Sequence, residues 1–110
     1  MDEREFADRA DRTLTRLLDA LEAALEGDDP DIELRGGVLT LDLDKAGQFV
    51  LNKHAPTRQV WLSSPVSGAS HYAWDEAAAV WRSTRGPDRL EVRLAADLAA
   101  ACGHPVNLGS

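Results

Sequence analysis

Acidic side chains recur at helical spacing within the first third of the chain. Asp8, Asp11, Asp19, Glu22 and Glu26 are separated by intervals that place them on one stripe of a helix, and more acids follow directly after it. Carboxylate oxygens are the ligands that hard cations prefer. An exposed stripe tolerates several of them because water and salt screen their repulsion, whereas burying them unpaired would be costly. The alternative is a solvated helix face with no ligand.

The chemistry predicted for these acids is weak, polydentate and poorly selective cation binding. The candidate metal ligands are Asp8, Asp11, Asp19, Glu22, Glu26, Asp29, Asp31 and Glu33. Residues 1–44 hold 14 Asp and Glu against 5 Arg, a net charge of −9, whereas residues 45–110 hold 5 acids against 7 Lys and Arg, a net charge of +2. The acidic half disfavours a phosphate backbone, so no nucleic-acid partner is expected.

A second group of candidate residues lies in residues 50–68, which read VLNKHAPTRQVWLSSPVSG. Two β-prone runs flank a turn with a proline, and successive side chains of a strand point to opposite faces. If Val60 and Leu62 point into a core, Trp61 points to the other face. An exposed tryptophan is unusual, and this residue type is enriched at binding hot spots. The alternative is that Trp61 only packs across neighbouring strands.

Polar and basic residues surround that tryptophan in the sequence. The amides of Asn52 and Gln59, which both donate and accept hydrogen bonds, should share its face. Lys53 and Arg58 would add positive charge beside it. The candidate partner-binding residues are Asn52, Lys53, Gln59 and Trp61.

The sequence contains no recognisable catalytic arrangement. No histidine lies four residues from another, and His54, His71 and His104 are each interpreted as surface or turn residues rather than metal ligands. Cys102 is the only cysteine, which excludes an internal disulfide and a cysteine-cluster metal site. The glycine pairs do not form a phosphate-binding loop. These absences favour a binding protein over an enzyme.

Two amphipathic helices and a series of short strands would position these residues. Apolar residues at spacings of three and four predict a helix over residues 3–26, ended by Gly27. A second helix is predicted before Gly103, beginning with a capping box of Asp88 and Glu91. Between them, alternating patterns predict strands at residues 31–35, 38–44, 48–53, 58–63, 71–74 and 80–83.

Short connections between these strands require antiparallel pairing, and Gly36-Gly37 is a hairpin signal. The predicted fold is a two-layer α+β sandwich: an antiparallel sheet of about five to seven strands with the N- and C-terminal helices packed on one face. The other face is then open to water, and Trp61 lies there. The 110 residues suit one domain, with no apolar run of about 20 residues for a membrane span. No membrane partner is expected.

Residues 47–65, GQFVLNKHAPTRQVWLSSP, resemble the central motif of the frataxin family. That motif is a strand ending in Asn-Lys or Asn-Arg, a turn containing Pro, and then Gln-hydrophobic-Trp-Leu, and each part is present in order. Ser67-Gly68 and Tyr72 follow it. Residues 36–40 look like the first hairpin of the family, and residues 90–98 look like its C-terminal helix. The resemblance spans nearly the whole chain, as a single frataxin-like domain over residues 1–110.

This resemblance implies a role in iron–sulfur cluster assembly. Frataxins are small bacterial or mitochondrial proteins that bind Fe²⁺ and Fe³⁺ weakly and reversibly on an acidic ridge. They bind a complex of cysteine desulfurase and iron–sulfur scaffold protein, modulate sulfur transfer and are candidates for iron delivery. A monomer is expected, with iron-dependent oligomerisation as the alternative. The expected location is the bacterial cytoplasm, or the mitochondrial matrix for a processed eukaryotic protein.

Two other functions remain open from the sequence. An iron-storage or ferroxidase protein would oxidise Fe²⁺ on the acidic surface. Such an activity typically uses carboxylates and histidines on facing helices, and the sequence has no Glu-x-x-His. The other function is a generic acidic interaction module unrelated to iron.

Overall fold

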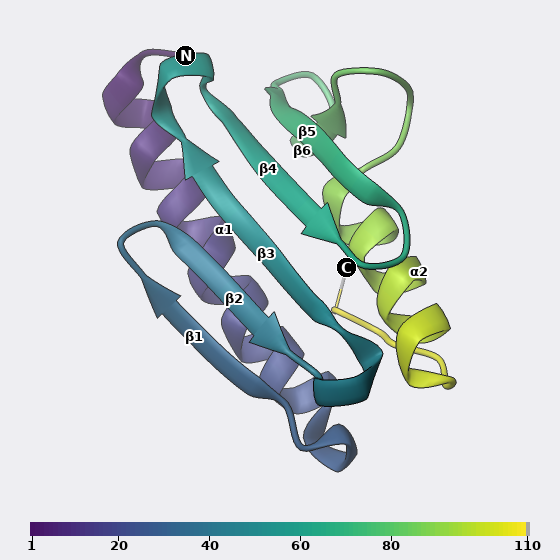
Figure 1. The fold of residues 1–110 in the computed structure, drawn as a ribbon. Coiled ribbons are helices and arrows are strands. Elements are labelled where there is room, and N and C mark those ends of the chain that lie inside the picture. The colour runs from purple at the N-terminus through teal and green to yellow at the C-terminus, as the bar shows by residue number, and fades with distance from the viewer. Residues whose placement is uncertain (110) are drawn as a thin grey trace.

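Two helices and a six-stranded sheet make up the computed structural model, which describes residues 1–109 (Figure 1). Ser110, the last residue of the predicted domain, lies outside the described residues. The elements in chain order are α1 (Glu3–Ala24), the 3₁₀ turn η1 (Glu26–Asp28), β1 (Asp31–Arg35), β2 (Val38–Asp42), η2 (Asp44–Ala46), β3 (Gln48–His54), η3 (Ala55–Thr57), β4 (Gln59–Ser64), β5 (Gly68–Asp75), β6 (Val80–Ser83) and α2 (Leu90–Cys102).

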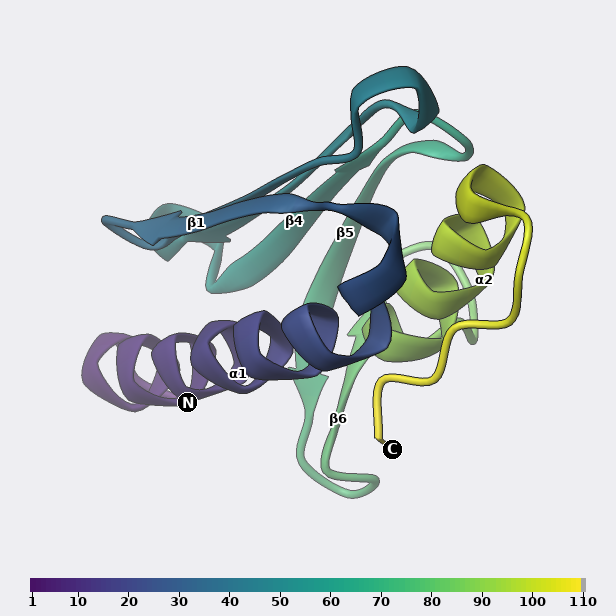
Figure 2. The same cartoon turned by 90° about the horizontal axis from the view of Figure 1, so that it is seen from below.

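The sheet is a meander in which every strand pairs antiparallel with its neighbour along the chain, in the order β1-β2-β3-β4-β5-β6. Both helices pack on the same side of it (Figure 2). The predicted two-layer α+β sandwich, with its sheet and its two terminal helices on one face, is confirmed. Neither helix within residues 1–109 combines the length and the apolar character needed to cross a membrane.

The core lies between the helices and the face of the sheet that they cover. Alternate residues of β2 to β6 point into it, together with the apolar stripes of α1 and α2. Fully burying a large apolar side chain stabilises a fold by about 1.5–3 kcal/mol. Its largest fully buried members are Phe6, Leu14, Leu17, Leu21, Leu25, Leu39, Leu41, Phe49, Leu51, Leu62, Tyr72 and Leu90.

Helix α1 begins at a capping acid, because the Asp2 carboxylate accepts a hydrogen bond from the Glu5 N–H at 2.8 Å. It ends at Ala24, two residues earlier than predicted, because the following residues tighten into η1. The chain then leaves through Asp29 in the left-handed conformation, with φ of 50°. This exit directs the chain into the edge strand β1.

The predicted capping box at the start of α2 is wrong. The residue at the N-cap is Arg89, and no side chain caps the helix. Asp88 instead accepts a hydrogen bond from Arg93 at 3.0 Å, and Glu91 pairs with Arg16 of α1. Each acid is therefore paired with an arginine, one of them 75 positions away, and neither caps the helix.

Two glycine turns fix the path of the sheet. Gly36 and Gly37 both have positive φ, 58° and 79°, as a two-residue type I′ hairpin requires, and they join β1 to β2 as predicted. Gly47, before β3, has φ of 101° and ψ of −178°, a region that only glycine occupies readily. A Cβ at position 47 would lie 2.8 Å from Pro65 Cγ. The close approach of the loop after β4 is therefore a second reason why this position requires glycine.

Candidate metal and docking surfaces

The eight carboxylates predicted as metal ligands are all exposed, and they lie along α1, on the turn after it and on the edge strand β1. Two of them have cationic partners. Asp11 accepts a hydrogen bond from Lys53 Nζ at 2.8 Å, and Glu33 pairs with Arg35 at 2.8 Å. Asp8 lies on the half of α1 that also carries several arginines.

The remaining five acids lie toward the C-terminal end of α1 and just beyond it, and within residues 1–109 none of them forms an ion pair. We call these five the acidic surface: Asp19, Glu22, Glu26, Asp29 and Asp31. The last turn of α1 has no basic residue. A helix C-terminus already carries roughly half a negative elementary charge. Carboxylates placed there oppose helix stability and strengthen the attraction for a cation.

The acidic surface is open rather than preorganised. Over the described part of the chain, no three of its carboxylates bring their oxygens within 4.8 Å of one another. An ion bound there would keep much of its hydration shell and would be screened by salt. The geometry therefore suits weak, reversible binding of a hard or borderline cation.

The face of the sheet opposite the helices carries Trp61, as predicted from its alternation with the buried Val60 and Leu62. Its indole is stacked between two imidazoles. The ring centroid of His54 lies 3.7 Å and that of His71 lies 4.3 Å from it, with interplanar angles of 12° and 14°. The cross-strand register of β3, β4 and β5 places the three rings together. The tryptophan is half-buried by its neighbours, yet no helix covers it.

Two amides complete this surface. Trp61 Nε1–H donates to Gln59 Oε1 at 2.8 Å, and Asn52 stands directly opposite Trp61 in the register of β3 and β4. We call the set of Asn52, His54, Gln59, Trp61 and His71 the indole platform. It is a rigid aromatic surface with amide groups at its side, which is a combination found at binding hot spots.

Lys53 does not belong to the indole platform, although it was predicted beside it. It alternates with Asn52 and therefore points to the helix-covered side, where it reaches Asp11. A different basic residue lies on the open face: Arg82 of β6 stands in the same cross-strand row as Gln59, with Ala73 between them.

Arg82 is held in place by a carboxylate. Its Nε donates to Asp75 Oδ2 at 2.8 Å. This hydrogen bond, supported by the backbone N–H of Ala78, lowers the pKa of Asp75 below its usual range. The open face therefore presents a charged pair one strand beyond the platform.

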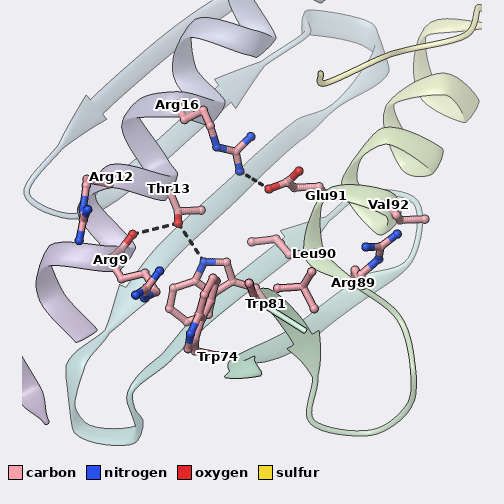
Figure 3. Close-up of a pocket in the computed structure, with 12 residues that line it drawn as sticks. Arg9, Arg12, Thr13, Arg16, Trp74, Trp81, Arg89, Leu90, Glu91 and Val92 are labelled. Carbon is pink, nitrogen blue, oxygen red and sulfur yellow. Dashed lines mark hydrogen bonds and ion pairs between the residues drawn. The ribbon is translucent and has the colours of Figure 1, made fainter. Parts of the chain in front are cut away.

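A hollow of about 410 Å³ lies between α1, the β5–β6 hairpin and the start of α2 (Figure 3). Its arginines are Arg9, Arg12, Arg16 and Arg89. The Arg9 guanidinium lies over the ring of Trp74, 4.1 Å from its centroid, and its buried Nε has no hydrogen-bond partner within residues 1–109. Trp81 forms part of the floor, and its Nε1–H donates to Thr13 Oγ1 at 2.9 Å. The positive charge of this hollow suits an anion rather than a metal ion.

Sequence reasoning missed this hollow because it considered only the acids of the first helix as candidate ligands. The available signal was their spacing, since Arg9, Arg12 and Arg16 recur every three or four residues and therefore share a side of α1. Their convergence with the two tryptophans of β5 and β6 depends on the packing of α1 against the sheet.

A family model for the frataxin-like domain matches residues 1–104. The chain belongs to the frataxin family. Mitochondrial frataxin of Arabidopsis thaliana is 40% identical over 98% of this chain, and the mitochondrial frataxin homolog of Schizosaccharomyces pombe is 39% identical over 93%. The chain covers 59% and 66% of those two relatives. The iron–sulfur cluster assembly protein CyaY of Thioalkalivibrio sulfidiphilus is 33% identical, with 94% of this chain and 95% of that protein aligned.

Solved frataxin structures share the architecture. Frataxin from Psychromonas ingrahamii matches with a TM-score of 0.86 over the full length of both chains, at 24% identity, which supports the fold alone. A trimeric frataxin from Saccharomyces cerevisiae, complexed with ferrous iron, matches with a TM-score of 0.76 at 34% identity, over 94% of this chain and 88% of that one. In this frataxin-family chain, the fold brings three of the four predicted docking residues onto one face and leaves Lys53 on the other.

Proposed function

We propose that this chain is an iron-binding accessory protein of iron–sulfur cluster assembly. In this role it docks on a complex of a cysteine desulfurase and its scaffold protein, and it modulates sulfur transfer or delivers iron. The observation that carries the proposal is the pairing of two separate surfaces in one frataxin-family domain: an acidic surface at the negative end of α1 and an uncovered indole platform on the sheet.

Iron binding is assigned to the acidic surface. Its five exposed carboxylates have no cationic partner among residues 1–109, so a cation meets no competing ion pair there. The open geometry favours loose binding of Fe²⁺ or Fe³⁺ that a partner can reverse, which is what delivery requires. A yeast relative was solved as a complex with ferrous iron, which supports iron binding as a property of this chain.

Partner docking is assigned to the indole platform. A tryptophan clamped between two imidazoles has few side-chain conformations left to lose, so contact with a partner costs little ordering entropy. The amides of Asn52 and Gln59 supply donors and acceptors beside the ring. A basic partner surface would also be attracted by the net charge of −7.

An anaerobic Fe²⁺ titration tests the metal assignment. The triple variant Asp19→Asn, Glu22→Gln, Glu26→Gln removes three charges from the acidic surface. The matched control Glu3→Gln, Glu5→Gln, Glu76→Gln removes three exposed charges elsewhere. We expect the first variant to lose most of its iron binding at low salt and the control to keep it. Equal iron affinities of the two variants would show that net charge, and not the position of the acidic surface, determines iron binding.

A binding and activity assay with a purified cysteine desulfurase–scaffold complex tests the docking assignment. Trp61→Ala should retain the melting temperature of the wild type within a few degrees but weaken binding by about 30-fold, the effect of a 2 kcal/mol hot spot. Asn52→Ala should also weaken binding, whereas Gln48→Ala, four residues away on the same strand and face, should not. Unchanged affinity of Trp61→Ala would refute the assignment.

Two further properties of the proposal are tested with the same preparations. Oxygen consumption after Fe²⁺ addition, compared with a protein-free control, separates iron delivery from ferroxidase activity. Light scattering with and without iron tests the expected monomer against iron-dependent oligomers, since a yeast relative was solved as a trimer. Two relatives are named as mitochondrial, which supports a mitochondrial matrix as the location, with a bacterial cytoplasm as the other location that we propose.

A further inference from the structure

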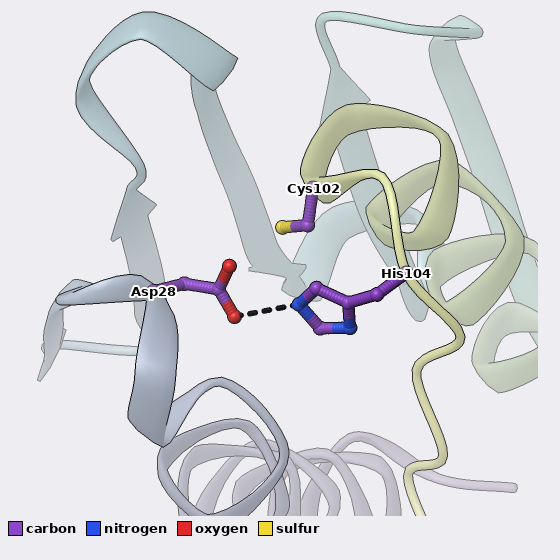
Figure 4. A group of neighbouring side chains, drawn as sticks. All are labelled: Asp28, Cys102 and His104. Carbon is purple, nitrogen blue, oxygen red and sulfur yellow. Dashed lines mark hydrogen bonds and ion pairs between the residues drawn. The ribbon is translucent and has the colours of Figure 1, made fainter.

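Three side chains with different donor atoms converge where η1 meets the end of α2 (Figure 4). The carboxylate of Asp28, the thiol of Cys102 and the imidazole of His104 each place a ligand atom within 4.8 Å of the other two. All three are half-buried. Asp28 and His104 are 76 positions apart in the sequence, so the fold and not local spacing brings them together.

The histidine is already oriented for a ligand role. Its Nδ1 lies 2.9 Å from the carbonyl oxygen of Pro105, and its Nε2 lies 2.8 Å from Asp28 Oδ2. When Nδ1–H donates to that carbonyl, Nε2 is the ring nitrogen that faces Asp28, and it can bind an ion once it has lost its proton. A backbone carbonyl that fixes the tautomer and the ring orientation is the usual support of a metal-bound histidine.

The donor set differs in chemistry from the acidic surface. One sulfur, one nitrogen and one oxygen favour a divalent ion of intermediate softness, above all Zn²⁺, which binds these atoms at about 2.0–2.3 Å. A tetrahedral ion needs donor–donor separations of roughly 3.3–3.8 Å. Small side-chain rotations reach that range from the separations observed, which are at most 4.8 Å.

The surroundings leave room for a fourth ligand. A cavity of about 330 Å³ adjoins Asp28 and Cys102, so water can reach an ion at this position. The ion would also lie beside the C-terminus of α2, where the helix dipole favours positive charge. Lys45 lines the same cavity and is exposed; its ammonium opposes the ion, and solvent screens that repulsion.

We propose that Asp28, Cys102 and His104 form a mononuclear Zn²⁺ site that is separate from the acidic surface and independent of iron binding. On binding, the ion takes the position of the proton between His104 Nε2 and Asp28 and displaces the thiol proton of Cys102. Both protons leave to solvent, and no electron is transferred. The bound ion joins the end of α1 to the C-terminal tail, whose Leu108 is packed in the core.

A Co²⁺ titration followed by optical absorption tests the site, with Zn²⁺ as the competitor. The wild type should bind Co²⁺ at one site with a thiolate-to-metal charge-transfer band and four-coordinate d–d bands, and Zn²⁺ should abolish both. Cys102→Ser should remove the charge-transfer band, and His104→Gln should weaken binding by at least about tenfold. A wild-type spectrum of six-coordinate Co²⁺ without the thiolate band would overturn the proposal.

Neighbouring residues supply matched controls. Asp28→Asn should weaken Co²⁺ binding, whereas Asp29→Asn, one position away and outside the cluster, should not; asparagine also accepts the left-handed backbone of position 29. Lys45→Ala should tighten binding at low salt. If Asp28→Asn and Asp29→Asn bound Co²⁺ equally well, the cluster would not be the site.

One variant distinguishes a failure of the Zn²⁺ proposal from a failure of the iron-binding proposal. The triple variant Asp19→Asn, Glu22→Gln, Glu26→Gln should keep the thiolate band and the Zn²⁺ competition. Zn²⁺ should raise the melting temperature of that variant as it does for the wild type, and it should not do so for Cys102→Ser. Loss of the Co²⁺ spectrum in the triple variant would assign the metal to the acidic surface and would also overturn the proposal.

Discussion

Replacing Thr13 with valine should destabilise the fold although the side chain keeps its shape. Thr13 Oγ1 accepts a hydrogen bond from the indole N–H of Trp81 at 2.9 Å and donates to the Arg9 carbonyl at 2.9 Å. Both partners of the first bond are buried, with 8% of Thr13 and 4% of Trp81 exposed. Valine removes the acceptor and leaves the N–H of the indole without a partner.

The expected loss follows from that orphaned donor. A buried polar group that loses its partner costs about 1–3 kcal/mol in the free energy of unfolding. A chain of this length has an unfolding entropy of about 0.23 kcal/mol/K, so the melting temperature should fall by about 4–13 °C. Thr15→Val is the matched control, because Thr15 makes the same bond to a carbonyl one turn back, at 2.9 Å, but is exposed and has no buried donor to satisfy. The control should shift stability by no more than about 0.5 kcal/mol.

Thermal and urea unfolding of both valine variants measure the difference. A double-mutant cycle with Trp81→Phe isolates the bond, since phenylalanine has no N–H and Thr13→Val should then cost little. Thr13→Val melting within a degree of Thr15→Val would refute the reasoning. So would an undiminished cost of Thr13→Val in the phenylalanine background.

Three further predictions concern other parts of the structure. Gly47→Ala should lower stability by about 1–3 kcal/mol or more in chemical denaturation, because its backbone lies in a glycine-only region and a Cβ would meet a proline ring at 2.8 Å; Gly68→Ala, with positive φ but open space around it, should cost less. Asp75 has a lowered pKa, so its carboxylate stabilises the fold at pH above the unfolded pKa of 3.8, and this stabilisation is lost as the pH falls through the folded pKa. The melting temperatures of wild type and Asp75→Asn should therefore converge in acid. A difference in melting temperature that stays constant with pH would contradict this. Lys53→Met should cost under about 1 kcal/mol by loss of its pair with Asp11 and should leave desulfurase binding unchanged, because Lys53 faces the helix side.

Periodicity was sufficient to predict the layers of the fold, because each helix and strand buries one face and the sequence records which residues those are. The stripe through Phe6, Leu14 and Leu21 and the alternation of Val60 with Leu62 both match the buried residues of the structure. The same alternation, counted on from Phe49, would also have placed Lys53 on the covered side. Lys53 was misplaced because it was assigned to a face by its closeness to Trp61 in the sequence, and not by its position in the alternation of β3.

The remainder of the site depends on which distant residues meet, and local patterns do not contain that information. His54 and His71 stack on Trp61 only because the register of three strands aligns them. Asp28 directly precedes the candidate ligand Asp29 in the sequence, yet it turns toward His104. Assigning such side chains to a surface from their sequence neighbours was therefore right for Asn52, Gln59 and Trp61 and wrong for Lys53.

The meander order of the sheet also determines how the chain can assemble during synthesis. Every strand finds its partner in the strand made just before it, so hairpins close over short loops and in the order of translation. Helix α1 leaves the ribosome before the strands, and it has no surface to pack against until β1 to β3 have emerged. Its apolar stripe is thus a large hydrophobic surface that a nascent chain must keep from aggregating until the sheet arrives.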